Sequence, residues 1–233
     1  MKNFGLISIA AIASALMATG SALAQGKDAP ARAKAPTSGW YAGGAIGYGG
    51  YRTKYSQTHG TIARTGATAW TVNADEDDTM WKAYVGYRLT PYVSVEGGYW
   101  DFGRPSYSAA IATPVATTMD RSFSVDGFGA DAALWLPLGI VDPILSNVSG
   151  FAKLGAIQTR VKASAAVPGG GLTPLPAESD DSLRAHWGVG VEYSVQRNWA
   201  ARLEFETLNN AGDNSTFGTA DIQMWSFGAN YRF

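Results

Sequence analysis

The sequence contains no cysteine and little charge. Without cysteine no disulfide bond forms, so hydrogen bonding and burial must stabilise the fold. Charged residues make up 16% of the 233 positions, whereas a typical soluble domain has roughly 25%. The formal net charge of −1 gives no support for a nucleic-acid partner. A surface this poor in charge must be covered by something other than ionic side chains.

A long hydrophobic run is also missing outside the N-terminal region. There, Lys2 precedes the apolar stretch Phe4–Met17, and the small-x-small pattern Ala22-Leu23-Ala24 follows, as in a secretory signal peptide. A stretch of about 14 apolar residues is too short to cross a bilayer as a helix. We therefore predict a signal peptide over residues 1–24, cleaved after Ala24, and no transmembrane helix after it.

The rest of the chain divides into a leader and one domain. Residues 25–38 combine prolines, alanines and basic residues without apolar periodicity, which predicts a flexible leader. From Gly39 to Phe233 the dominant pattern has a period of two, which is typical of β-strands and is presented by no helix. In the last segment, alternate residues are apolar: Trp225, Phe227, Ala229, Tyr231 and Phe233.

Eight segments show this alternation. They span residues 39–50, 79–89, 92–103, 121–136, 150–162, 182–195, 199–208 and 220–233. The links after the second and sixth segments are tight, whereas those after the first, third, fifth and seventh are long and polar. This alternation of short and long ends is typical of an all-β, eight-stranded, antiparallel up-and-down barrel. Residues 137–149 depart from it, because they are longer and more apolar than a tight turn.

Alternation alone fits either a soluble barrel with an apolar core or a transmembrane barrel with an apolar exterior. Three features favour the membrane: the polar face is rich in glycine and in charges of both signs, the apolar face is nearly free of charge, and aromatic residues lie near the strand ends. Lys153 is the exception on the apolar face. The predicted aromatic girdle consists of Trp40, Trp81, Tyr87, Trp187, Trp199, Trp225 and Tyr231.

The polar face is predicted to line a narrow lumen. Its charged residues are Lys82, Arg88, Glu96, Asp131, Arg184, Glu192, Arg202, Glu204 and Glu206. An eight-stranded barrel leaves its interior almost filled by side chains, so these charges must pair. We expect a salt-bridged plug that holds the strand register, and the alternative is a gated conductance.

Other polar motifs carry weaker hypotheses. His186 lies near Ser182 on the polar face, which raises the alternative of a lipid-modifying enzyme. His59 is expected to be a solvated loop residue, and the acidic run Asp75–Asp78 lacks the ligand spacing of a calcium loop. The stretch Pro168–Gly171 is expected to be a flexible surface loop. We therefore predict no catalytic residue, no cofactor and no metal site.

Several stretches together resemble the OmpA-like transmembrane barrels. They are Gly39-Trp40-Tyr41-Ala42-Gly43, residues 91–99, Gly190-Val191-Glu192-Tyr193, Arg202-Leu203-Glu204-Phe205, residues 209–213 and Tyr231-Arg232-Phe233. The resemblance implies that Glu96, Glu192 and Arg202 belong to a lumen charge cluster, and that Phe233 belongs to the signal read by the barrel-insertion machinery. It also implies a lysine in the fourth strand, but Ala133 stands there, which puts an opening and closing ion pair in doubt.

The resemblance implies a structural and surface-display role in the bacterial outer membrane. Members of the family act through their loops as antigens, adhesins or phage receptors, so the expected partners are outer-membrane lipid, lipopolysaccharide and host or phage surfaces. A narrow porin-like diffusion channel is the alternative. No segment resembles the peptidoglycan-binding domain that follows many such barrels, so we expect no anchoring to the cell wall.

Overall fold

The computed structural model describes residues 38–53, 55–114, 116–166, 173, 177–213 and 218–233. The predicted signal peptide, residues 25–37 of the leader and the loop Pro168–Gly171 lie outside the described residues. The elements are β1 (Gly39–Thr53), α2 (Tyr55–Ala63), β2 (Ala69–Asp75), β3 (Asp77–Thr90), β4 (Val93–Asp101), β5 (Ser106–Thr113), β6 (Thr117–Pro137), η2 (Leu138–Ile140), η3 (Pro143–Leu145), β7 (Val148–Ala166), β8 (Glu178–Ser194), β9 (Trp199–Asp213) and β10 (Gly218–Arg232).

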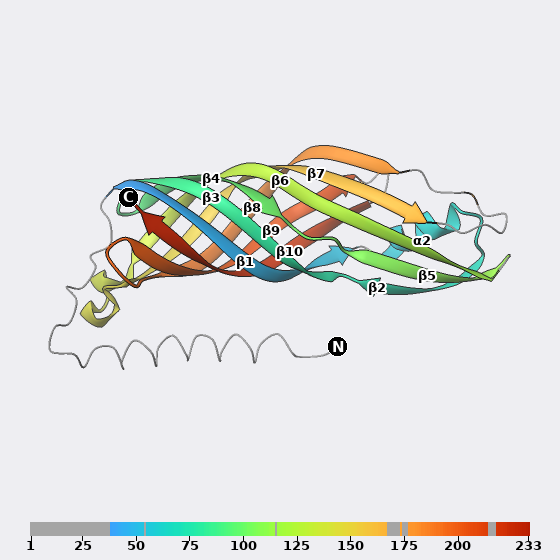
Figure 1. Ribbon diagram of the computed structural model, residues 1–233, viewed down its shortest axis with the longest axis horizontal. Helices are drawn as coiled ribbons and strands as arrows, with labels where there is room; N and C mark the ends of the chain where they lie inside the picture. Colours follow the sequence, from blue (N-terminus) through green and yellow to red (C-terminus); the bar gives the residue numbers. More distant parts are fainter. Residues whose placement is uncertain (1–37, 54, 115, 167–172, 174–176, 214–217) are drawn as a thin grey trace. The chain divides into compact units, whose positions relative to one another are not determined.

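Eight strands close into a barrel (Figure 1). Going round the ring, β1, β3, β4, β6, β7, β8, β9 and β10 pair in turn, and β10 pairs with β1. Every pair is antiparallel. Closure leaves no free edge within the ring, as a hydrocarbon solvent requires of backbone N–H and C=O groups. These eight strands are the eight predicted segments, and the predicted fold class is confirmed.

The barrel has two different ends. The turns β3–β4 and β8–β9 and the β6–β7 connection lie at the inner end, as we name it, and the connections β1–β3, β4–β6, β7–β8 and β9–β10 lie at the outer end. In the β3–β4 turn the Thr90 hydroxyl accepts hydrogen bonds from the backbone N–H groups of Tyr92 and Val93, each at 3.1 Å. Residues 137–149, for which the sequence predicted no structure, form two 3-10 turns at the inner end, and Asp142 caps the second at 2.8 Å from the Ile144 nitrogen.

The outer end carries an extension that the sequence did not predict (Figure 1). Strand β5 pairs with the outer part of β6, from Ser106 opposite Ser122 to Ile111 opposite Thr117. Strand β2 pairs with the far side of β5. Helix α2 contributes Ile62 to an apolar cluster whose other members are Ala67, Ala109, Ile111 and Met119. This small second core orders part of the two longest connections.

The two faces of each strand differ in the way that the sequence predicted. In β3, alternate residues such as Lys82, Tyr84 and Arg88 are buried, whereas Trp81 and Val85 between them are exposed. The exposed residues of the ring are mostly large and apolar, and the buried ones include most of the charged residues. A soluble barrel shows the opposite arrangement. No helix among the described residues is long and apolar enough to cross a membrane.

Lys153 corrects one prediction. Its placement on the outward apolar face is wrong, because the side chain is 1% exposed and pairs with carboxylates inside the barrel. The outward positions beside it are Ala152 and Leu154. Lys153 stands opposite Ala133 of β6 in the strand register, so the inward side chain beside it on that strand is small. The outward row of β7 is therefore free of charge at this level.

Glycine on the inner face makes room for aromatic rings. A Cβ atom at Gly86 would overlap the ring of Tyr41, and one at Gly190 would overlap the ring of Phe151. Gly86 stands opposite Tyr41, and Gly190 stands opposite Phe151, in the strand register. The large rings can therefore lie flat across the lumen only because the opposing residue has no side chain.

Candidate functional site

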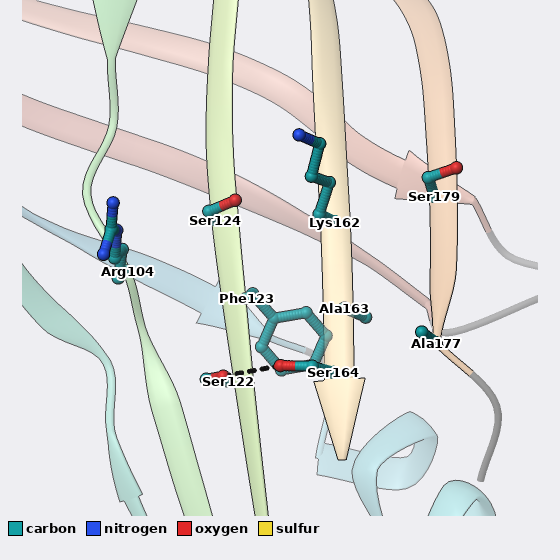
Figure 2. A pocket seen from close by; sticks show the side chains of 9 residues that line it. All are labelled: Arg104, Ser122, Phe123, Ser124, Lys162, Ala163, Ser164, Ala177 and Ser179. Carbon is teal, nitrogen blue, oxygen red and sulfur yellow. Dashed lines mark hydrogen bonds between the residues drawn. The ribbon is translucent and has the colours of Figure 1, made fainter.

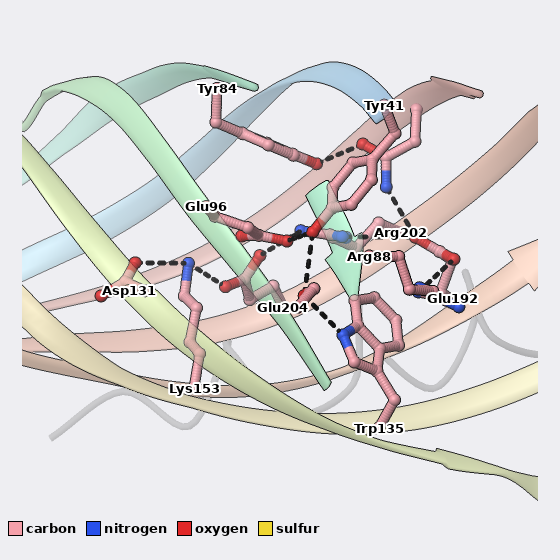
Figure 3. Close-up of polar contacts among 12 residues, drawn as sticks. Tyr41, Tyr84, Arg88, Glu96, Asp131, Trp135, Lys153, Glu192, Arg202 and Glu204 are labelled. Carbon is pink, nitrogen blue, oxygen red and sulfur yellow. Dashed lines mark hydrogen bonds and ion pairs between the residues drawn. The ribbon is translucent and has the colours of Figure 1, made fainter. Parts of the chain in front are cut away.

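The described residues hold one extensive polar cluster inside the barrel, and Figure 3 shows its contacts from close by. We call it the ionic network. Because alternate residues of each strand face inward, strands from all sides of the ring contribute to it. Its ionic members are Lys82, Arg88, Glu96, Asp131, Lys153, Glu192, Arg202, Glu204, Glu206 and Arg232, joined by His186.

Arg202 of β9 lies at the centre of the ionic network. Its two terminal nitrogens contact Glu96 at 2.9 Å and Glu192 at 3.3 Å. Its guanidinium carbon is 4.8 Å from the ring centroid of Phe151 and 4.9 Å from that of Tyr84. The planar guanidinium group suits such a site, since it bonds carboxylates along its edge and stacks on rings with its faces. Arg202 thus ties β4 and β8 to β9 across the lumen.

Two lysines hold the next level of the ionic network, toward the outer end. The Lys82 ammonium group is 2.6 Å from Glu204 and 2.5 Å from Glu206. Lys153 lies 2.6 Å from Glu206 and 3.7 Å from Asp131, and also pairs with Glu204. Each of the two glutamates is therefore shared by both lysines, which brings β3, β7 and β9 together.

The resemblance implied a lysine in β6, and Lys153 of the neighbouring strand β7 supplies a lysine at the same level. The expected lysine of the fourth barrel strand is replaced by Ala133, and Lys153 of β7 stands directly opposite Ala133 in the strand register. A cation is therefore present at the same level of the lumen, delivered by the adjacent strand. Its partners are Glu204, Glu206 and Asp131, so it is already fully engaged by carboxylates.

His186 forms part of the same ionic level. Its Nδ1 atom is 2.8 Å from Asp131 and its Nε2 atom is 3.2 Å from Glu206. The ring also meets the edge of Trp100, with 5.5 Å between centroids. Ser182, the candidate nucleophile, donates its hydroxyl proton to Asp180 at 2.9 Å. The structure therefore gives His186 and Ser182 separate acidic partners and forms no hydrogen bond from one to the other.

The inner mouth of the lumen is closed by a second group of ions. Glu192 pairs with Arg232 at 2.6 Å and with Arg88 at 3.6 Å. The Arg88 guanidinium group stacks over Trp135, 3.9 Å from the ring centroid. The cavity at this mouth has a volume of only about 30 Å³, enough for a water molecule or two.

The charges of the ionic network balance. Five cations (Lys82, Arg88, Lys153, Arg202 and Arg232) face five carboxylates (Glu96, Asp131, Glu192, Glu204 and Glu206). Each has its partners within ion-pair distance. Removing one partner of such a buried pair costs about 3 to 5 kcal/mol, since the other charge is left uncompensated.

The outer half of the lumen is apolar, which the sequence analysis missed. We call this cluster the apolar layer; it consists of Tyr51, Met80, Trp100, Phe102, Val125, Ile157, Val161, Leu208, Ala211, Ile222 and Met224. These residues continue the inward rows of the charged residues, with Met80 two positions beyond Lys82 and Leu208 two beyond Glu206. The signal was present in the sequence, because the inward rows change from charged to apolar toward the outer ends of the strands.

Eight of the nine charged residues predicted to line the lumen meet in the ionic network: Lys82, Arg88, Glu96, Asp131, Glu192, Arg202, Glu204 and Glu206. Arg184 does not join them. It pairs with Asp180 of its own strand at 3.8 Å, and its side chain is 24% exposed. The sequence analysis left Lys153 out of the lumen because it assigned this residue to the apolar face. It also did not count Arg232, which pairs with Glu192, among the lumen charges.

The predicted girdle residues lie on the outside in two belts. The inner belt contains Trp40 with Tyr87, and Trp199 with Tyr231 and Phe233; the outer belt contains Trp81 with Tyr99 and Phe128, and Trp187 with Phe205 and Trp225. Trp40 and Tyr48 of β1 mark the two levels eight positions apart, or ~26 Å along the strand. With strands tilted by about 40°, this gives ~20 Å in height, close to the roughly 25 Å band of a membrane barrel.

Residues 35–233 match the family model of the OmpA-like transmembrane domain. The chain belongs to the OmpA-like transmembrane domain family. The outer membrane protein A of Klebsiella pneumoniae is 29% identical over 195 residues, and that of Salmonella typhi is 30% identical over 195 residues. Each match covers 83% of this chain and 51% or 48% of the relative, so the chain spans about half the length of these relatives.

The fold is also found in a solved structure. Neisserial surface protein A superposes with a TM-score of 0.54 at 13% identity, covering 85% of this chain and 100% of that protein. At this identity the similarity concerns the fold alone. Together with the family match, it places the chain among the OmpA-like barrels of bacterial outer membranes.

Proposed function

We propose that this OmpA-like barrel is a structural protein that displays an ordered extension at the cell surface, and that its lumen is closed to diffusion. The observation that carries the proposal is the two-layer filling of the lumen. An ion that enters from the inner end meets a balanced ionic network with no unpaired site to occupy. Beyond it lies the apolar layer, in which Met80, Trp100, Ile157 and Met224 are at most 1% exposed.

The apolar layer separates this proposal from the channel alternative. A rearranged set of ion pairs could open a path through the ionic network alone. It would not wet the apolar layer, because the few polar groups there are already bonded, as the Tyr51 hydroxyl is to the Phe102 carbonyl at 2.8 Å, and do not replace the hydration shell of an ion. Two physically different barriers in series therefore oppose the passage of ions.

Single-channel conductance in planar bilayers tests the closed lumen. The wild type is expected to give no reproducible openings. A Met80→Gly/Met224→Gly variant removes two side chains from the apolar layer and keeps the ionic network; it is expected to stay closed. A variant that adds Arg202→Ala to these changes is expected to conduct. Reproducible openings of the wild type that disappear on Arg202→Ala would support the diffusion channel instead.

The extension supports the display role. Its apolar cluster, with Trp70, Val72 and Tyr107 packed against it, gives the outer end a rigid platform of α2, β2 and β5. Trp70 donates a hydrogen bond to His59 of α2 at 2.9 Å, which adds a polar tie between helix and strand. We extend the proposal to binding of host or phage surfaces by this platform and the neighbouring loops.

The proposal excludes enzyme activity. Lipid hydrolysis or acyl transfer by serine needs a hydroxyl group activated by a neighbouring base. His186 is held between Asp131 and Glu206 inside the lumen, whereas Ser182 is hydrogen-bonded to Asp180. An unchanged lipid A composition in cells that carry the His186→Ala variant is the expected result.

A further inference from the structure

The connection between β6 and β7 carries an exposed apolar surface at the inner end of the barrel. Ile140 is 65% exposed, Val141 is 73% exposed and Ile144 is 78% exposed. We call these three residues the apolar foot. Asp142 is the only charged residue between Pro137 and Ser149. A contiguous group of large apolar side chains with this exposure marks an interaction surface.

The inner belt of aromatic residues has a gap at the same place. Six strands of the ring present an aromatic residue outward near their inner ends: Trp40 of β1, Tyr87 of β3, Tyr92 immediately before β4, Tyr193 of β8, Trp199 of β9 and Tyr231 of β10. The aromatic residues at the inner ends of β6 and β7 are Trp135 and Phe151, which are buried and pack on each other inside the barrel. The outward residues beside them are Leu136 and Gly150. Of the described strands of the ring, β6 and β7 are thus the two without an outward aromatic anchor at the inner end.

The lipid-facing wall runs into the apolar foot. On β6, the outward residues Leu134 and Leu136 are 67% and 50% exposed. The chain then passes through Pro137, Leu138 and Gly139 to Ile140, without a charged residue. The apolar foot therefore extends the surface that already faces the acyl chains.

The outer end of the same two strands shows the contrast (Figure 2). There, Asp126 of β6, Arg160 of β7 and Asp181 of β8 stand opposite one another and form a charged row. Beyond this row the wall is hollowed and polar, with Ser122, Ser124, Lys162 and Ser164 among the residues that line it. In the described chain, no such row separates the apolar foot from the apolar wall at the inner end.

The backbone of the two 3-10 turns bonds to itself. Five N–H groups of the connection donate to acceptors within it: those of Val141, Asp142, Ile144, Leu145 and Ser146. The acceptor for Ile144 is the Asp142 carboxylate at 2.8 Å, so the one charged side chain is also engaged. Gly139 lets the two turns lie close together, because a Cβ atom there would be 2.8 Å from the Cα atom of Ser146. Peptide groups without partners are costly in lipid, so this conformation suits a membrane interface.

We propose that the apolar foot inserts into the headgroup region of the phospholipid leaflet at the inner end and anchors the β6–β7 side of the barrel there. It takes the place of the aromatic residues that hold the other six strands at this interface. A lipid surface is the favoured occupant, because the apolar foot is continuous with the wall that lipid covers. The two turns also lie to one side of the inner end, where the leaflet is, and not across the mouth of the lumen (Figure 1). The inference goes beyond the proposed function, since it concerns the end of the barrel opposite the extension.

Fluorescence quenching in phospholipid nanodiscs tests the inference, because both faces of a nanodisc are open to buffer. A nitrobenzoxadiazole label is attached to Ile144→Cys in the cysteine-free chain. Arg197→Cys is the matched control, since Arg197 is exposed in the β8–β9 turn at the same end. The label at 144 is expected to be quenched by lipids that carry a nitroxide near the headgroup and to be shielded from iodide. The label at 197 is expected to show the reverse.

Two results of this measurement overturn the inference. One is equal quenching by iodide at positions 144 and 197, which would place the apolar foot in water. The other is a label at 144 that is shielded from iodide but not quenched by the nitroxide lipids, which would assign the surface to a second copy or another protein.

Substitution of the apolar foot supplies a second readout. The Ile140→Asn/Ile144→Asn variant is expected to lower the equilibrium constant for folding in phosphatidylcholine vesicles about tenfold, from the lost partial burial of two side chains. The Ile140→Trp/Ile144→Trp variant is expected to keep this constant within about twofold, because tryptophan favours the membrane interface. Urea-induced unfolding followed by circular dichroism measures both. An unchanged constant in the asparagine variant, or an equal loss in the two variants, contradicts the inference.

Discussion

Lys153 shows how much one side chain decides in a lumen of this kind. It contacts three carboxylates, and among the described residues Lys82 is the only other lysine or arginine within ion-pair distance of Glu206. Removing the charge at this position leaves a surplus of negative charge among buried side chains. The stability of the barrel therefore depends on Lys153 although the residue touches neither lipid nor solvent.

We expect Lys153→Met to lower the free energy of unfolding by about 3 to 5 kcal/mol, the cost of leaving buried charge uncompensated. Urea-induced unfolding in lipid vesicles, followed by tryptophan fluorescence, measures it. Lys162→Met is the matched control, because Lys162 lies on the same strand but is exposed; its effect should stay within about 0.5 kcal/mol. Equal effects of the two substitutions would show that Lys153 is not engaged as described.

Gly86 tests the packing of the lumen at the same scale. A methyl group at Gly86 would overlap the ring of Tyr41, so Gly86→Ala should destabilise the barrel by about 1 to 3 kcal/mol through overpacking. At Gly97 the nearest atom to a new methyl group is a backbone oxygen at 3.8 Å. Gly97→Ala should therefore have little effect in the same unfolding assay. A neutral Gly86→Ala would mean that Tyr41 does not lie across the lumen.

At the scale of elements, the sequence predicted the ring and missed the extension. Strands of the ring alternate between inward and outward residues over nine or more positions, because lipid and lumen require opposite polarity of successive side chains. Strands β2 and β5 are short and lie in water on one face, so their alternation is weak. Helix α2 is likewise only nine residues long. Such elements are specified by their shared apolar cluster, which single-sequence patterns do not reveal.

The ionic network was predictable in composition and not in detail. Inward parity identified Glu96, Glu192, Arg202 and their neighbours, because a charge on the lipid face costs roughly 2 to 4 kcal/mol at the midplane. For Lys153 the alternation predicted the wrong face, because the predicted assignment of inward and outward residues in that strand was shifted by one residue. Which ions pair also depends on the stagger between distant strands, as with Lys82 of β3 and Glu204 of β9, and no local pattern encodes that.

The cysteine-free sequence makes the position of the extension directly testable. Asn73 of β2 is exposed on the extension, and Arg197 is exposed in the short β8–β9 turn at the inner end. A membrane-impermeant maleimide added to intact cells should label Asn73→Cys and leave Arg197→Cys unlabelled. Both variants should be labelled after lysis. Labelling of Arg197→Cys alone in intact cells would invert the orientation and contradict the display role.

At the scale of the whole molecule, the account depends on which face of the sheet meets lipid. The outward rows present apolar side chains between two aromatic belts, and the inward rows present ions and then the apolar layer. The family match and the fold agree with this arrangement. The predicted signal peptide, its cleavage after Ala24 and the role of Phe233 in insertion stay predictions.

Spin-label accessibility in lipid bilayers tests this central claim most directly. Single labels at Leu154→Cys and Lys162→Cys sample one outward row of β7 at two heights, because both residues are exposed and eight positions apart. The label at 154 is expected to collide with oxygen dissolved in the acyl chains, and the label at 162 with a water-soluble nickel complex. Strong nickel collisions at position 154 would place the apolar row in water and contradict the account.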